Sequence, residues 1–311
     1  MNASKFVAFS KPRKATIVAT ATALLLVAVK LTVGLLTGTV TVMASAADSL
    51  LDFLVSSFNV FAVHNTERPT DASYNYGRGK IEGVAAALEG LFILASALYI
   101  LREAVLKIVT PTAITDPQLL WALAAMGFSM AATLVLTLYL RRLSAVSPSL
   151  VVKADSVHYQ TDLLTNGGIV IALGAIRFTG WVWLDPAIGI AISIYVAQAA
   201  IPLLRKGLQM LLDRALEDDI VAKIRKIALG HNDRVTGVHE LKTRRSGDTH
   251  FVEFHLVFDE NIRLREAHSI ADEIETKVRG LGRARWVINI HLDPVDDSYR
   301  DRKLSGGNGE E

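Results

Sequence analysis

The chain contains six runs of mostly apolar residues, each long enough to cross a lipid bilayer as a helix. A hydrocarbon core of about 30 Å requires about 20 such residues. Charged side chains are sparse here, since residues 1–206 carry only 27 of the chain's 64 Lys, Arg, Asp and Glu residues. This pattern excludes a soluble fold for residues 15–206 and predicts a membrane all-α domain. We expect its six transmembrane helices over residues 15–37, 40–64, 81–106, 117–140, 148–175 and 181–203.

Basic residues predict how this domain lies in the membrane. They precede the first predicted helix and follow the second, fourth and sixth, as with Lys11, Arg78, Arg141 and Arg205. Since positive charges favour the cytoplasmic side, both termini are predicted to be cytoplasmic, in the inner (plasma) membrane. Residues 1–14 are then a cytoplasmic N-terminus, because the first apolar run is too long for a signal-peptide core.

The remaining residues have the pattern of a small cytoplasmic α+β domain, residues 207–296. Apolar residues recur there with helical spacing in some segments and alternate in others. We expect helices over 217–230 and 263–279 and strands over 238–244, 250–258 and 285–293. Residues 297–311 are rich in Gly and polar residues, which predicts a disordered tail.

Composition excludes several classes of site. The chain has no cysteine, so disulfides, thiolate nucleophiles and thiolate metal ligands are absent. A metal here has to be bound by nitrogen and oxygen ligands. The formal net charge of +2 gives no indication of a nucleic-acid partner.

Ionisable residues lie inside two predicted transmembrane helices, where they are costly and mark functional sites. The second contains Asp48 and Asp52, and the fifth contains His158 and Asp162. Residues four apart share one helix face. If the two faces meet, one nitrogen and three oxygen ligands converge, which suits a divalent cation, with Zn²⁺ the first candidate.

Other charged residues lie within the predicted transmembrane helices, and three of them are Asp155, Lys30 and Glu89. Asp155 precedes His158 by one helical turn, and we expect it at the entrance to the site or as a helix cap. Lys30 and Glu89 also need partners in a membrane. The sequence assigns no role to either.

The paired motifs, together with six spans and a C-terminal α+β domain, resemble the cation diffusion facilitator family, in particular its bacterial zinc/iron-type members. Further stretches that resemble it are residues 76–82, 158–162 and 211–216, and the resemblance covers roughly residues 10–295. It implies a homodimeric secondary active transporter, and not an enzyme, that exports divalent metal ions in exchange for protons. It also implies a ferredoxin-like cytoplasmic domain.

The resemblance assigns roles to particular residues. Asp48, Asp52, His158 and Asp162 match its transport site. Lys80 and Asp213 match a salt bridge that links the membrane and cytoplasmic parts.

One loop departs from the family pattern. Many bacterial members have a second metal site after the second span, built from an Asp and two His. Here Asp71 is kept, but Tyr74 and Arg78 stand at the His positions. Because arginine is a cation and only a hydrogen-bond donor, we predict that this loop site is absent.

The cytoplasmic domain is rich in histidine. Strand alternation directs His255 away from the core face and places His291 and Asp293 together on a polar face, which makes a plausible half-site. By resemblance, this part holds a regulatory zinc site that favours the dimer. The matching residues are His239, His255, His268, His291 and Asp293.

These features predict an efflux transporter for a divalent cation, most readily Zn²⁺. Cd²⁺ follows, and Fe²⁺, Co²⁺, Mn²⁺ and Ni²⁺ remain open because ligand type discriminates poorly among them. The first alternative is a membrane metal sensor or scaffold that binds metal without moving it. The second is an intramembrane metalloenzyme, which would need an open metal position and a general base.

Overall fold

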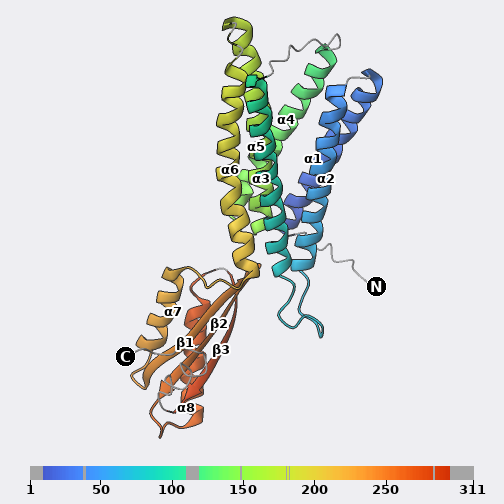
Figure 1. Cartoon of the computed structure of the whole chain (residues 1–311). Coiled ribbons are helices and arrows are strands. Elements are labelled where there is room, and N and C mark those ends of the chain that lie inside the picture. The colour runs from blue at the N-terminus through green and yellow to red at the C-terminus, as the bar shows by residue number, and fades with distance from the viewer. Residues whose placement is uncertain are drawn as a thin grey trace, which may run out of the picture. The chain divides into compact units, whose positions relative to one another are not determined.

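The computed structural model describes residues 10–37, 40–109, 119–147, 149–179, 181, 183–282 and 284–294. The chain forms two compact units, Met1–Gln209 and Met210–Glu311. The first unit is a bundle of long helices (Figure 1). These are α1 (Lys11–Thr37), α2 (Val40–Thr66), α3 (Lys80–Val109), α4 (Leu119–Ser144), α5 (Leu150–Thr179) and α6 (Leu184–Leu211).

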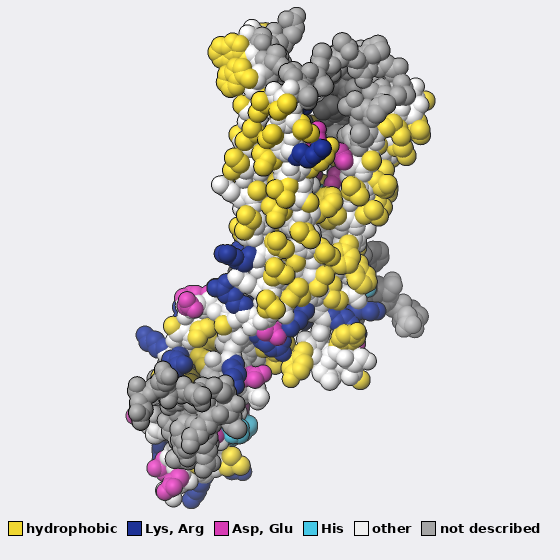
Figure 2. All heavy atoms as spheres, in the orientation of Figure 1, with side chains coloured by type: hydrophobic (Ala, Val, Ile, Leu, Met, Phe, Trp, Pro, Cys, Tyr) yellow, Lys and Arg dark blue, Asp and Glu magenta, His cyan; other side chains and the backbone are white. Residues whose placement is uncertain are grey.

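The helices of this unit expose apolar side chains, as expected for a surface in contact with lipid. Figure 2 shows hydrophobic side chains over most of the visible face of the helical unit. Within the described residues, four segments are long and apolar enough to cross a membrane. They are Lys11–Leu36, Ser45–Thr66, Lys80–Val109 and Pro186–Leu211. A helical transmembrane domain follows, while the crossing of α4 and α5 remains a prediction.

Helices α3 and α6 approach each other closely at two glycines. A Cβ atom on Gly207 would lie 2.6 Å from the backbone nitrogen of Ala87, and one on Gly90 would lie 2.7 Å from that of Leu204. Small residues permit such close packing in a membrane, where no hydrophobic effect drives helices together. The absence of a side chain at Gly90 and Gly207 therefore allows the two helix backbones to pack this closely.

The substitution Gly207→Ala is therefore expected to destabilise the membrane domain by about 1–3 kcal/mol, because backbone atoms of α3 would have to move. The matched control is Gly127→Ala on α4, where a Cβ would meet nothing within 4 Å. There the alanine is expected to be neutral or stabilising by up to about 1 kcal/mol. Thermal unfolding in detergent measures both variants, and equal shifts in the two would contradict the packing argument.

The second unit is an α+β domain with a three-stranded sheet. Its elements are α7 (Asp218–Gly230), β1 (Val235–Ser246), β2 (Thr249–Phe258), α8 (Leu264–Arg279) and β3 (Arg285–Asp293). The sheet order is β1-β2-β3, with β1 antiparallel and β3 parallel to β2. The core contains Phe254 and Leu256 of β2 and Ile274 of α8, all almost fully buried. Each predicted helix and strand is present, and β1 is longer than expected.

The ferredoxin-like fold stays an expectation for this unit. That fold has the order β-α-β-β-α-β. The described residues give α7-β1-β2-α8-β3, which is the same order without its first strand.

Candidate metal sites

Helices α2 and α5 bring three of the four predicted transport-site ligands together. The Nε2 atom of His158 lies 3.2 Å from Oδ1 of Asp52 and 3.6 Å from Oδ2 of Asp162. One ligand atom from each residue lies within 4.8 Å of the other two. His158 is buried, and the two carboxylates are partly exposed. His158 and Asp162 thus lie on one face of α5, as their spacing predicts, and this face packs against Asp52 of α2.

Asp48 lies outside this group. It is one helical turn before Asp52 on α2, and its side chain is exposed. The structure therefore brings Asp52, His158 and Asp162 together without the fourth predicted ligand.

A buried hydrogen bond joins α2 and α5 next to these ligands. The hydroxyl groups of Ser56 and Tyr159 lie 3.0 Å apart, and both residues are buried. Ser56 follows Asp52 by one turn, and Tyr159 follows His158 directly. This pair therefore joins α2 and α5 directly beside Asp52 and His158.

Lys30 of α1 contacts the same region of α2. Its Nζ donates a hydrogen bond of 2.8 Å to Oγ of Ser49, which lies between Asp48 and Asp52 in the sequence. A second, longer bond of 3.4 Å reaches the carbonyl oxygen of Ser45. Lys30 therefore places a positive charge beside the acidic turn of α2, a role that the sequence did not assign.

Asp155 and Glu89 share a hydrogen-bond donor that the sequence analysis missed. The Nδ2 group of Asn59 donates to Oε2 of Glu89 over 2.9 Å and to Oδ1 of Asp155 over 2.7 Å. Asp155 does not cap α5, because that helix begins at Leu150 and the carboxylate bonds to α2 instead. The signal for Asn59 was present in the sequence, since it lies seven residues after Asp52 and so on the same face of α2.

The loop between α2 and α3 contains an ion pair at the position where we predict that the second metal site is absent. Arg78 lies 2.5 Å from Oδ2 of Asp71, and its guanidinium lies 4.1 Å from the ring centroid of Tyr74. The hydrogen bond from Arg78 lowers the pKa of Asp71 below its ordinary value. The carboxylate of Asp71 therefore already forms an ion pair with Arg78.

The cytoplasmic unit places three histidines in a row across its sheet. His239, His255 and His291 are direct partners on β1, β2 and β3. All three imidazoles surround the carboxylate of Asp293. His255 Nδ1 and His239 Nε2 lie 2.9 and 3.2 Å from its Oδ2, and His291 Nε2 lies 3.1 Å from Oδ1. Asp293 is buried, and one ligand atom each from His239, His255 and Asp293 lies within 4.8 Å of the others, a group that does not include His291.

His268 and Asp213, to which the resemblance assigns roles, contact other residues within their own unit. The imidazole of His268 is exposed and lies 3.5 Å from Asp272 on the same helix, outside the group around Asp293. The carboxylate of Asp213 lies 3.5 Å from Arg244. A bond from Asp213 to Lys80 would join the two units and stays a prediction.

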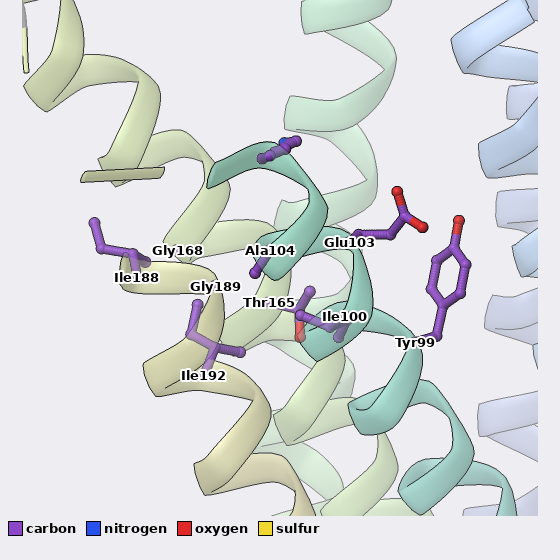
Figure 3. Close-up of a pocket in the computed structure, with 10 residues that line it drawn as sticks. Tyr99, Ile100, Glu103, Ala104, Thr165, Gly168, Ile188, Gly189 and Ile192 are labelled. Atoms are coloured by element: carbon purple, nitrogen blue, oxygen red, sulfur yellow. The ribbon is translucent and has the colours of Figure 1, made fainter. Parts of the chain in front are cut away.

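A small cavity of about 150 Å³ lies between α3, α5 and α6 (Figure 3). Apolar side chains such as Ile100, Ile188 and Ile192 form much of its wall. Gly168 and Gly189 also line it. Glu103 and Lys107 are its charged residues, and it contains none of the predicted metal ligands.

Comparison with known protein families matches both units. A family model for the cation efflux transmembrane domain matches residues 16–212, and one for the cytoplasmic domain of cation efflux proteins matches residues 216–295. The chain belongs to the cation efflux (cation diffusion facilitator) family of divalent metal transporters. It is thus a secondary transporter and not an enzyme, as the sequence predicted.

Curated relatives agree with this assignment over nearly the whole chain. The cation-efflux pump FieF of Shewanella oneidensis is 37% identical over 275 residues, which cover 88% of this chain and 91% of the relative. FieF of Escherichia coli O1:K1 / APEC is 34% identical over 292 residues, covering 94% and 96%. A solved CzrB structure in its Zn form is 33% identical and covers 27% of this chain and 96% of that chain, with a TM-score of 0.25.

Proposed function

We propose that this transporter exports Zn²⁺ from the cytoplasm in exchange for protons. Divalent cation efflux follows from the family, whereas the metal and the counter-ion are inferences from the site. The observation that carries them is the convergence of Asp52, His158 and Asp162 within an otherwise apolar helical unit. No other arrangement of ligands in the described membrane helices combines an imidazole with two carboxylates at such distances.

The ligand set supports Zn²⁺ as the preferred cargo. One imidazole nitrogen and carboxylate oxygens are ordinary ligands of tetrahedral zinc, and Asp48 could supply the fourth after a local rearrangement of α2. Cd²⁺ has similar requirements. Fe²⁺, Co²⁺, Mn²⁺ and Ni²⁺ accept the same ligands, so geometry and supply would decide among them.

The same ligands support proton exchange. An imidazole and carboxylates bind metal only when deprotonated, so metal and protons compete for one set of atoms. Protonation from a more acidic outer side would release the ion, and the protons would then be carried inward. In this scheme the proton gradient drives export without a nucleotide.

Orientation and assembly complete the proposal. Six membrane-spanning helices with both termini in the cytoplasm would place the histidine-rich domain on the cytoplasmic side. A homodimer formed through that domain, and tightened by metal at Asp293, would couple cytoplasmic zinc to the membrane domain as a form of allostery. The match to a cytoplasmic-domain model named for dimerisation supports this arrangement.

Flux into proteoliposomes under an imposed pH gradient tests the proposal. With an acidic compartment on the side that receives the metal, Zn²⁺ transport is expected to accelerate, and dissipating the gradient with a protonophore should abolish the acceleration. A panel of Zn²⁺, Cd²⁺, Fe²⁺, Co²⁺, Mn²⁺ and Ni²⁺ ranks the cargo.

Two outcomes would contradict parts of the proposal separately. Flux that is indifferent to the gradient would exclude proton exchange but leave metal efflux intact. A metal transported faster than Zn²⁺ at equal concentration would overturn the assignment of the cargo. His158→Ala serves as the control for flux that bypasses the site.

A further inference from the structure

We propose that Asn59, Glu89 and Asp155 form a second cation site inside the membrane domain, which binds the divalent metal during its passage to Asp52, His158 and Asp162. The inference rests on the transport function proposed above and adds a step to it. It assigns a role to three residues on three different helices, α2, α3 and α5.

The three side chains form one closed group. Asn59 uses a single nitrogen atom to donate to both carboxylates, so the accepting oxygens of Glu89 and Asp155 are held close together. The relative exposure is 0% for Asn59 and Asp155 and 1% for Glu89. Carboxyl groups so deeply buried are rare unless they are paired, are protonated or bind a metal.

Each member of the group presents an oxygen atom that has no hydrogen-bond partner. These atoms are Oδ1 of Asn59, Oε1 of Glu89 and Oδ2 of Asp155, and all three are buried. An unsatisfied buried polar atom destabilises the fold, and more so when the group is charged. Three of them in one group, from three helices, indicate that a ligand completes the arrangement.

The charge of the group indicates the kind of ligand. Two carboxyl groups share one neutral amide as a hydrogen-bond donor. A divalent cation would neutralise both charges and coordinate the free oxygens. The all-oxygen ligand set is less specific than one that contains an imidazole, as suits a site that a transported ion occupies briefly.

The group lies on the predicted cytoplasmic side of the transport site. Asn59 is seven residues beyond Asp52 on α2, about 10 Å along the helix, toward the end at Thr66. Asp155 is three residues before His158 on α5, toward the start at Leu150. An ion that enters from the cytoplasm would meet this group first.

A cleft reaches the group between α2 and α3. Its volume is about 460 Å³, and its lining includes Asn59 and Glu89 among apolar side chains such as Leu54 and Phe58. Phe92 also lines it, and the Phe92 ring lies 6.2 Å from that of His158. The buried group therefore lies behind the apolar wall of this cleft, with the transport site close by.

We expect this second cation site to bind zinc with low affinity. A site on a transport path has to bind well enough for the ion to enter and weakly enough for it to leave. Three oxygen ligands without an imidazole should bind zinc more weakly than the Asp52/His158/Asp162 group. The site is therefore expected to affect the metal concentration at half-maximal flux more than the maximal flux.

The test uses the full chain with zinc as the probe. In a background of Asp52→Asn and Asp293→Asn, which weakens the other two sites, equilibrium dialysis should still detect one weak zinc site per chain. Adding Glu89→Gln, which keeps the shape of the side chain, should weaken that residual binding at least about 10-fold. In the otherwise unaltered chain, the same substitution should raise the KM for zinc flux about 5- to 10-fold, with maximal flux within about 2-fold.

Two further variants test whether Asn59, Glu89 and Asp155 bind zinc. Glu103→Gln lies on the same helix outside the group and should leave binding and KM unchanged. Asn59→Asp adds a carboxylate and should tighten residual zinc binding at least about 5-fold. A purely structural network predicts no such gain.

Two results would overturn the inference. The first is residual zinc binding that neither Glu89→Gln nor Asn59→Asp alters. The second is a loss of maximal flux in Glu89→Gln at constant KM and binding. Because binding is measured without transport, a failure of the proton-exchange proposal would leave this readout unaffected.

Discussion

Asp52→Asn is expected to reduce zinc flux more than about 100-fold while leaving the chain folded. The substitution keeps the size of the side chain but removes a charged ligand atom that lies 3.2 Å from Nε2 of His158. Loss of a group that only supports a metal ligand already costs about 10- to 100-fold, so loss of a ligand itself should cost more. Initial rates in proteoliposomes, at zinc concentrations above the KM of the parent chain, measure the effect.

The matched control for Asp52→Asn is Glu103→Gln, an acid-to-amide change on another membrane helix. It should retain flux within about 2-fold, because Glu103 lies outside the metal group and its carboxylate instead pairs with the neighbouring Arg102. Flux in Asp52→Asn that equals the control would show that the Asp52/His158/Asp162 group is not the transport site.

Asp293→Asn is expected to remove the zinc-dependent stabilisation of the cytoplasmic unit. Its carboxylate is the atom group on which His239, His255 and His291 converge from three strands. A ligand at 100 times its Kd stabilises a folded protein by about 2.7 kcal/mol, so zinc should raise the unfolding temperature of the parent chain measurably. In Asp293→Asn that increase should largely disappear.

Asp219→Asn is the control for this second experiment. Asp219 is exposed on α7 and pairs with Lys223, one helical turn away, so the zinc-dependent shift should be preserved. The readout is the unfolding transition with and without zinc, in chelator-treated protein. A full shift in Asp293→Asn would contradict a metal site on the sheet.

Much of the fold could be predicted because a membrane imposes simple rules. Apolar runs of sufficient length have to be helices, so the predicted run 40–64 corresponds closely to α2 at Val40–Thr66. The strand that contains His255 was also predictable, since Val252, Phe254 and Leu256 alternate with it and are buried. Both are local patterns. Such patterns suffice to predict an element when its environment dictates which of its residues are apolar.

Contacts between helices were less accessible to sequence analysis. Spacing placed Asp48 and Asp52 on one face of α2. It could not predict which of the two lies opposite His158 of α5. In the observed packing, Ser56 of α2 is hydrogen-bonded to Tyr159 of α5, and Asp48 is exposed. Asn59 was overlooked because an amide carries no charge, although its partners Glu89 and Asp155 were recognised as needing explanation.

The Arg78–Asp71 pair has a consequence for how the loop responds to its surroundings. A diffusible ion at this position would come and go with the metal content of the cell, whereas a guanidinium is covalently part of the chain. Because the hydrogen bond from Arg78 lowers the pKa of Asp71, the pair is lost at a lower pH than that at which an ordinary aspartate is protonated. This loop should therefore keep one conformation in metal starvation and in metal excess, so that metal-dependent change is confined to the remaining sites.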